Sequence, residues 1–77
     1  MERDPRKDPR PGDIHAGPVI QLRVERAMEG IGGLEYVECS MAFYGSSEFK
    51  GSRRFTPAQF QEFVGGDKTE VLHVAGA

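Results

Sequence analysis

Four residues of the types used in metal or nucleophilic chemistry are spread along the chain: Asp13, His15, Cys39 and His73. Metal ligands usually recur at short, regular spacings, and a cysteine nucleophile needs a base within hydrogen-bond reach. No such spacing links these four residues, although pairing of the first and last strands of a barrel would bring His15 and His73 together. We therefore expect no metal, no cofactor and no catalytic residue, with Cys39 as a small buried hydrophobe.

Two glycine-rich stretches, residues 30–33 and 65–69, invite comparison with phosphate-binding loops. Neither has the spacing of a dinucleotide-binding or Walker sequence, and the segment after each looks like a strand rather than a helix. Both are predicted to be turns.

Acid–base chemistry would need carboxylates held close together in a cleft. Glu25, Glu35 and Glu38 could approach one another across a hairpin, yet exposed strand faces commonly carry such residues for solubility. A chain this short also has a thin core, which leaves little depth for a pocket. The sequence therefore favours a protein that is not an enzyme.

The stretch from residue 44 to residue 55 has the composition of a recognition surface. It mixes aromatic side chains, small hydrogen-bonding residues and three cations, and aromatic and arginine side chains dominate binding hot spots and stack on single-stranded bases. The alternative is a flexible loop with solvated charges and buried phenylalanines. The candidate binding residues are Tyr44, Phe49, Lys50, Arg53 and Arg54.

Length and composition limit the class of protein. Seventy-seven residues fit one small domain, and 38% hydrophobic with 29% charged residues is typical of a folded, soluble one. The net charge of −2 argues against strong phosphate binding by the whole domain. A single cysteine excludes an internal disulfide, and the chain has no apolar leader or membrane-length run, so we expect a cytoplasmic protein.

The chain divides into an arm and a domain. Residues 1–10 contain the near-repeat Asp-Pro-Arg twice and no apolar residue after Met1, so they are predicted to be a disordered, solvated arm. Residues 11–77 are predicted to form a single small globular domain.

Alternation of apolar and polar side chains predicts strands in residues 20–28, 34–44, 48–55 and 69–75. The first of these is ambiguous, because residues 18–29 also match the spacing of an amphipathic helix that starts at Pro18 and ends at Gly30. The alternative fold is therefore an α+β protein in which a helix at 18–29 packs on a small antiparallel sheet.

The clearest local signal predicts a short helix. Thr56 can cap it, with Pro57 at the first helical position and Gln59 completing a capping box. Phe55 and Phe60 are placed as a hydrophobic staple, and Gly65 should end the helix.

The predicted order opens with a short strand at residues 11–14, continues through a long hairpin and places the helix just before the last strand. This layout resembles small SH3-like β-barrels, some of which, the ribonuclease-type toxins, also open on Gly-Asp-Ile, here Gly12, Asp13 and Ile14. The resemblance lies in the layout and implies a mainly β fold of five strands and one helix. It implies no activity, because such barrels host unrelated functions.

Three functions remain open. The favoured one is a small non-catalytic binding or adaptor module that acts through protein–protein contact, as accessory subunits and phage-made inhibitors do. The alternative is a nucleic-acid-binding SH3-like barrel that uses Lys50, Arg53 and Arg54. A hydrolase or nuclease using His15, Cys39 or His73 is the least favoured.

Overall fold

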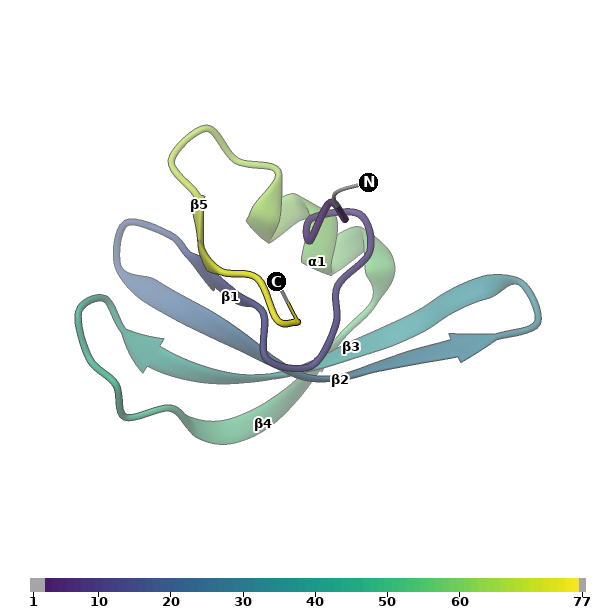
Figure 1. The fold of residues 1–77 in the computed structure, drawn as a ribbon, viewed down its shortest axis with the longest axis horizontal. Coiled ribbons are helices and arrows are strands. Elements are labelled where there is room, and N and C mark those ends of the chain that lie inside the picture. The colour runs from purple at the N-terminus through teal and green to yellow at the C-terminus, as the bar shows by residue number, and fades with distance from the viewer. Residues whose placement is uncertain (1–2, 77) are drawn as a thin grey trace.

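A computed structural model describes residues 3–76, which form one antiparallel sheet and a single short helix (Figure 1). The sheet has five strands in the order β4-β3-β2-β1-β5. The elements along the chain are β1 (Ile14–Ala16), β2 (Ile20–Gly30), β3 (Gly33–Phe43), β4 (Lys50–Phe55), α1 (Pro57–Val64) and β5 (Glu70–His73).

The predicted mainly β fold is confirmed, with its five strands and a helix before the last one. The alternative helix at residues 18–29 is wrong, since β2 runs from Ile20 to Gly30 and the described chain has no helix there. The sheet is not closed: β4 and β5 lie at opposite edges, so the described residues form an open, twisted sheet rather than a complete barrel.

Strands β2 and β3 form a long hairpin that pairs from Ile20 with Phe43 to Gly30 with Gly33. Its turn end projects away from the body of the molecule (Figure 1). Within the turn, Gly33 is the residue with a positive φ, of 110°, which glycine adopts without the steric cost that a side chain would add. The glycine-rich stretch at residues 30–33 is thus a hairpin turn, as predicted.

Helix α1 begins and ends where its local sequence predicts. The Thr56 hydroxyl accepts the Gln59 backbone N–H, the Gln59 side chain accepts the Thr56 N–H, and Gly65 is the C-cap. This capping box satisfies two N–H groups that would otherwise lack partners. The helix buries Phe60 and Val64.

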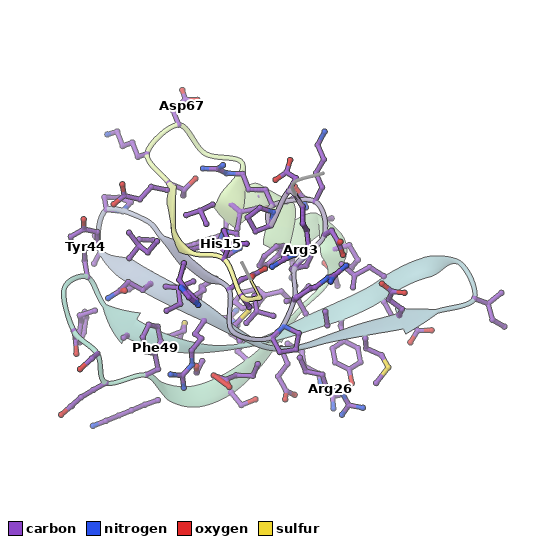
Figure 2. The ribbon with its side chains drawn as sticks, in the orientation of Figure 1. Arg3, His15, Arg26, Tyr44, Phe49 and Asp67 are labelled. Atoms are coloured by element: carbon purple, nitrogen blue, oxygen red, sulfur yellow. The ribbon has the colours of Figure 1, made fainter. Side chains whose placement is uncertain are left out.

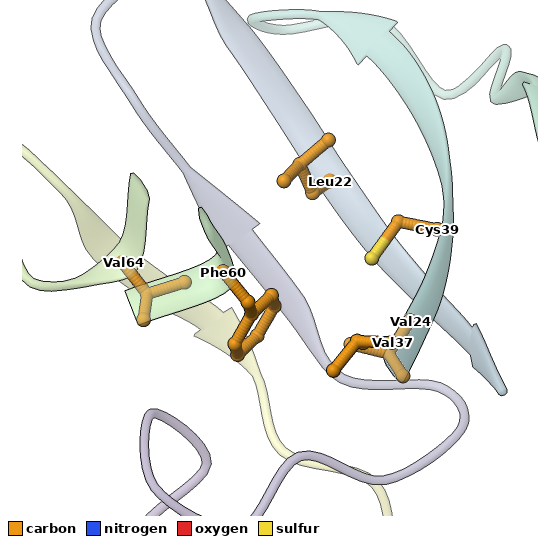
Figure 3. Packing of buried hydrophobic residues seen from close by; sticks show 6 residues of the cluster. All are labelled: Leu22, Val24, Val37, Cys39, Phe60 and Val64. Atoms are coloured by element: carbon orange, nitrogen blue, oxygen red, sulfur yellow. The ribbon is translucent and has the colours of Figure 1, made fainter. Parts of the chain in front are cut away.

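The hydrophobic core lies between α1 and the middle of the β2–β3 hairpin (Figure 3). Its inward-facing positions follow the period-two pattern expected of strands. Leu34, Phe55 and Phe63 pack around its margin. The buried cluster consists of Leu22, Val24, Val37, Cys39, Phe60 and Val64.

Residues 3–10, the described part of the predicted arm and called the N-terminal segment below, pack against the domain rather than extending into solvent. Pro5 and Pro9 are buried. The Arg6 guanidinium donates to the carbonyl of Val64 at 3.0 Å, where it satisfies an acceptor at the end of α1. Composition missed this packing because it does not show that a charged side chain has a partner inside the fold.

Candidate protein-docking site

Apolar side chains surround a surface hollow of about 570 Å³ where β2 begins and β3 ends. Phe43 is 74% exposed and Met41 is 36% exposed. Val19 and Tyr44 are exposed beside them. The sequence predicted little room for a pocket because the core is thin, but the hollow lies at the surface, beyond the core. It is lined by Ile20, Met41, Ala42, Phe43, Ser46, Glu48 and Lys50.

The hollow exists because α1 is much shorter than the strand it covers. Val37, Cys39, Met41 and Phe43 share one parity along β3, yet only Val37 and Cys39 are buried. A helix of eight residues is about 12 Å long, whereas eleven residues of strand extend about 36 Å. The inward face of β3 therefore continues past the helix and meets solvent at Met41 and Phe43.

The loop between β3 and β4 is held in place by a buried glutamine. The Gln21 side-chain amide donates to the carbonyl of Phe43 at 2.7 Å and to that of Ser46 at 3.0 Å. The Tyr44 N–H donates to the Val19 carbonyl at 2.9 Å, and Gly45 turns the chain with a φ of 85°. The loop that forms one wall of the hollow is thus held to β2 by Gln21 and to Val19, the residue before β2.

Tyr44 lies at the outer side of this loop and is 55% exposed (Figure 2). Its hydroxyl donates to a carboxylate oxygen of Glu70, in β5, at 3.1 Å. The same contact raises the pKa of Tyr44, because the phenol proton is held by a negative charge. Tyr44 therefore presents its ring to solvent in a defined position.

Phe49, a predicted binding residue, packs against an arginine of β2. It is half-buried, and the Arg23 guanidinium lies 4.7 Å from its ring centre. Arg23 also forms a 2.6 Å ion pair with Glu25, whose pKa is lowered by hydrogen bonds from Arg23 and Ser40. Phe49 is thus part of a packed polar cluster on the sheet surface.

The predicted cations are separated along β4. Lys50 lines the hollow and lies 3.8 Å from Glu48 in an exposed pair, which contributes little to stability. Arg53 stacks over Phe55, with 5.4 Å between its guanidinium and the ring centre. The structure therefore brings Lys50 to the hollow and leaves Arg53 farther along the same strand.

Arg54 is engaged by its neighbours in β3. Its guanidinium lies 4.4 Å from the Tyr36 ring centre and 3.2 Å from the Glu38 carboxylate. Adjacent strand residues project to opposite faces, so Arg53 and Arg54 do not form one surface. This geometry therefore does not form a continuous phosphate-binding strip from Lys50 to Arg54.

The residues with possible catalytic chemistry lie in separate environments. Burial, with Glu25 and Glu38 nearby, raises the pKa of the Cys39 thiol to about 12. His15 is buried and His73 exposed, although Ile14 pairs with His73 in the sheet. Between residues 3 and 76, no three His, Cys, Asp or Glu side chains are grouped as metal ligands.

His15 is enclosed by the N-terminal segment and α1. Its ring meets that of Phe60 edge to face at a centroid distance of 5.4 Å, and its Nε2 has no hydrogen-bond partner among the described residues. Burial lowers the pKa of His15, since the imidazolium would lose hydration; Asp13 acts in the opposite direction and Arg6 adds to the lowering.

Sequence reasoning did not identify Met41 and Phe43 as surface residues. Their alternation with Ser40 and Ala42 places them on the face of Cys39, but alternation does not show what covers that face. The signal that could have identified them is the difference in length between the helix and the strand. The predicted helix ends after two turns, while the strand pattern continues for eleven residues and must extend beyond it.

The one helix in the described part of the chain is too short and too polar to cross a membrane. Scans against models of protein families, curated proteins and solved structures found no match to this chain.

Proposed function

We propose that this chain is a non-catalytic binding module that docks on a protein partner, with the hollow beside Phe43 receiving an apolar side chain of that partner. The observation that carries this proposal is the exposure of Phe43 and Met41 on the strand face that continues from the core residues Val37 and Cys39. Burying a large apolar side chain is worth roughly 2 kcal/mol, and clustered exposed apolar residues mark interaction sites.

The walls of the hollow are held in place by hydrogen bonds, which favours a partner that binds in one defined pose. Gln21 fixes the loop, and Tyr44 is oriented by Glu70. A site that is ordered before binding loses less conformational entropy when the partner arrives. Phe43 and Tyr44 are the proposed anchors, with Lys50 at the rim.

The nucleic-acid alternative has weaker support. Glu48 lies beside Lys50, and Glu38 binds Arg54, so a phosphate backbone following these cations would also meet two carboxylates. Affinity for nucleic acid grows with the number of phosphates that Lys and Arg neutralise, and carboxylates beside these cations oppose that gain. We place the protein-binding function in the cytoplasm, because a chain with one cysteine cannot depend on an internal disulfide.

Affinity capture from the native source with three forms of the chain tests the proposal. The wild type and Ile31→Ser should retain one stoichiometric protein, and Phe43→Ser should lose it. Ile31 is the matched control, because it is a fully exposed apolar residue in the distant hairpin turn. Equal capture by all three forms, or nucleic acid as the retained species, would reject docking at the hollow.

A further inference from the structure

Strand β4 is an open edge of the sheet with an unusual charge. Within residues 3–76 it pairs with β3 on one side and with no strand on the other. Its six residues, Lys50–Phe55, include three exposed cations and no acidic residue, in a chain whose net charge is −2. Unpaired backbone groups on a strand edge are a template for pairing with another chain.

We propose that β4 binds an acidic, extended segment of the partner protein, which adds to the sheet as a sixth strand. This inference rests on the proposed function and specifies the chemistry of the partner: a strand rich in Asp or Glu with one apolar side chain for the hollow. Main-chain hydrogen bonds to the open edge would supply affinity, and alternate side chains would supply specificity.

The backbone of β4 is suited to this pairing from Arg53 to Phe55. These residues pair in regular register with Cys39, Glu38 and Val37 of β3. In an antiparallel ladder, successive residues direct their N–H and C=O groups to alternate sides. At least one residue of this trio therefore presents both groups to the open side.

The cations lie at positions that an added strand can reach. Arg53 forms no ion pair among the described residues, so an acidic side chain of an added strand can meet it without displacing a carboxylate. Arg54 projects to the opposite face of the sheet and already binds Glu38. Lys50 lies at the rim of the hollow, and a register shift in β4 places its β3 partner only two residues from that of Arg53, roughly 7 Å along the sheet. One short segment could thus reach both Arg53 and the hollow.

Charge also disfavours two other occupants. Pairing of β4 with the β4 of a second copy would place like charges opposite each other, which destabilises a sheet. A nucleic acid would have to track cations that face opposite ways, one of them bound to Glu38. Acidic peptide is the occupant whose geometry and charge match the edge.

Three fluorescein-labelled ten-residue peptides provide the test: one alternating Glu and Thr around a central Phe, the same peptide with Lys for Glu, and the acidic peptide N-methylated at alternate backbone positions. Anisotropy should show the acidic peptide binding at least tenfold more tightly than the other two. Amide hydrogen exchange in β4 should slow when the acidic peptide is bound. Equal binding of all three peptides, or unchanged exchange in β4, would overturn strand pairing.

Matched charge variants locate the binding. Arg53→Glu should weaken binding of the acidic peptide at least tenfold and Arg53→Gln less, while Lys68→Glu should change it less than twofold. Lys68 is an exposed cation in the turn before β5, at the other edge of the sheet. Circular dichroism melts confirm that each variant is folded. Equal losses from Arg53→Glu and Lys68→Glu would reject a specific site on β4.

The same measurements separate this inference from the proposed function. If Phe43→Ser weakens binding while Arg53→Glu and N-methylation do not, docking at the hollow stands and strand pairing fails. If only the edge variants matter, strand pairing stands and the hollow fails. Tighter binding of a labelled 20-nucleotide single strand would show that nucleic acid, not an acidic peptide, is the occupant of β4. Concentration-dependent dimerisation in sedimentation would show that the occupant is a second copy of the chain.

Discussion

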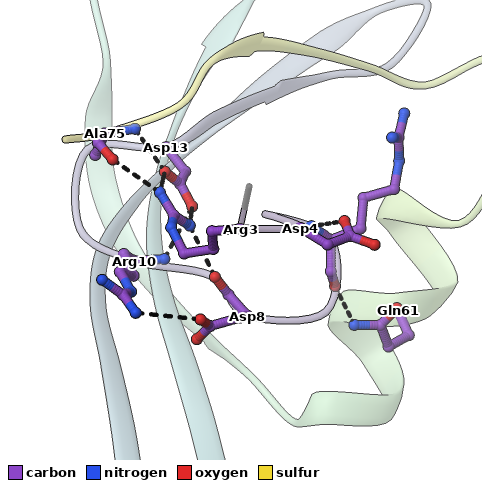
Figure 4. A network of polar contacts seen from close by, with 8 residues as sticks. Arg3, Asp4, Asp8, Arg10, Asp13, Gln61 and Ala75 are labelled. Atoms are coloured by element: carbon purple, nitrogen blue, oxygen red, sulfur yellow. Dashed lines mark hydrogen bonds and ion pairs between the residues drawn. The ribbon is translucent and has the colours of Figure 1, made fainter. Parts of the chain in front are cut away.

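The guanidinium of Arg3 binds the buried carboxylate of Asp13 through two hydrogen bonds of 2.6 and 2.7 Å (Figure 4). The same carboxylate accepts the backbone N–H of Arg10 at 2.9 Å and that of Ala75 at 2.8 Å. Arg3 also donates to the Ala75 carbonyl. Asp13 therefore joins the N-terminal segment, the start of the sheet and the C-terminal end of the described chain.

Replacing Asp13 should destabilise the whole domain. Asp13→Ala leaves the Arg3 guanidinium and two backbone donors without their acceptor, and breaking such a buried pair costs about 3 kcal/mol of unfolding free energy. Urea denaturation measures the loss. Asp8→Ala is the control, because Asp8 holds Arg10 at 3.3 Å in an exposed pair and should cost about 0.5 kcal/mol or less. Similar losses in both variants would show that the Asp13 network does not stabilise the fold.

Stability should decrease in two steps as the pH falls. The first comes from His15: burial lowers its pKa in the folded state, so the unfolded chain binds the proton first and stability declines below about pH 6.5. His15→Leu should remove this step, and His73→Ala, at an exposed site, should retain it. Urea midpoints at pH 7.5, 6.0 and 5.0 test this, and a flat wild-type profile over that range would contradict it.

The second acid step comes from Asp13. Burial acts to raise its pKa, but hydrogen bonds from Arg3, Ala75 and Arg10 outweigh burial and lower it. The stabilisation is present above the carboxyl's unfolded pKa of about 4 and is lost as the pH falls through the lower folded value. Asp13→Asn should remove this step and leave the His15 step in place.

Cys39 should react only when the protein unfolds. Its thiol is fully buried, and its pKa of about 12 leaves almost no thiolate at pH 8. Ellman's reagent should therefore label the native protein slowly and the urea-unfolded protein at the rate of a free cysteine peptide. Rapid labelling of the native protein would show that the core opens readily or that Cys39 is a reactive site.

Thr56→Ala should destabilise the domain by about 1 kcal/mol, because the first turn of α1 loses its capping acceptor. Thr56→Ser keeps a hydroxyl at the same position and should retain most of the stability. Thermal melts followed by circular dichroism measure both. Equal melting temperatures for wild type and Thr56→Ala would mean that the cap contributes nothing.

Helix α1 was predictable because its signals are local. Thr56, Pro57, Gln59 and Gly65 act within one or two turns, so their spacing alone places both ends of the helix. The segment at residues 18–29 carried two periodicities at once. Pairing with β3 at ten positions selects the strand, and that partner is distant in sequence for most of its length.

The candidate site was only partly predictable. Tyr44 and Lys50 were identified from composition, and the structure places Lys50 in the lining of the hollow and Tyr44 directly after Phe43. Phe43 itself was not identified as a binding residue. Parity states which face a side chain occupies but not what covers that face. Coverage depends on where α1 ends over the sheet.

The sequence by itself determined the class of fold, the helix and its caps, the hairpin turn and the inward face of each central strand, because these depend on spacings of a few residues. Tertiary structure decided that the N-terminal segment folds back, that Met41 and Phe43 are exposed, and that Arg53 lies at an open edge. Each of these depends on contacts between residues far apart in the chain: Arg3 with Asp13 and Ala75, α1 with half of β3, and β4 with one neighbour instead of two.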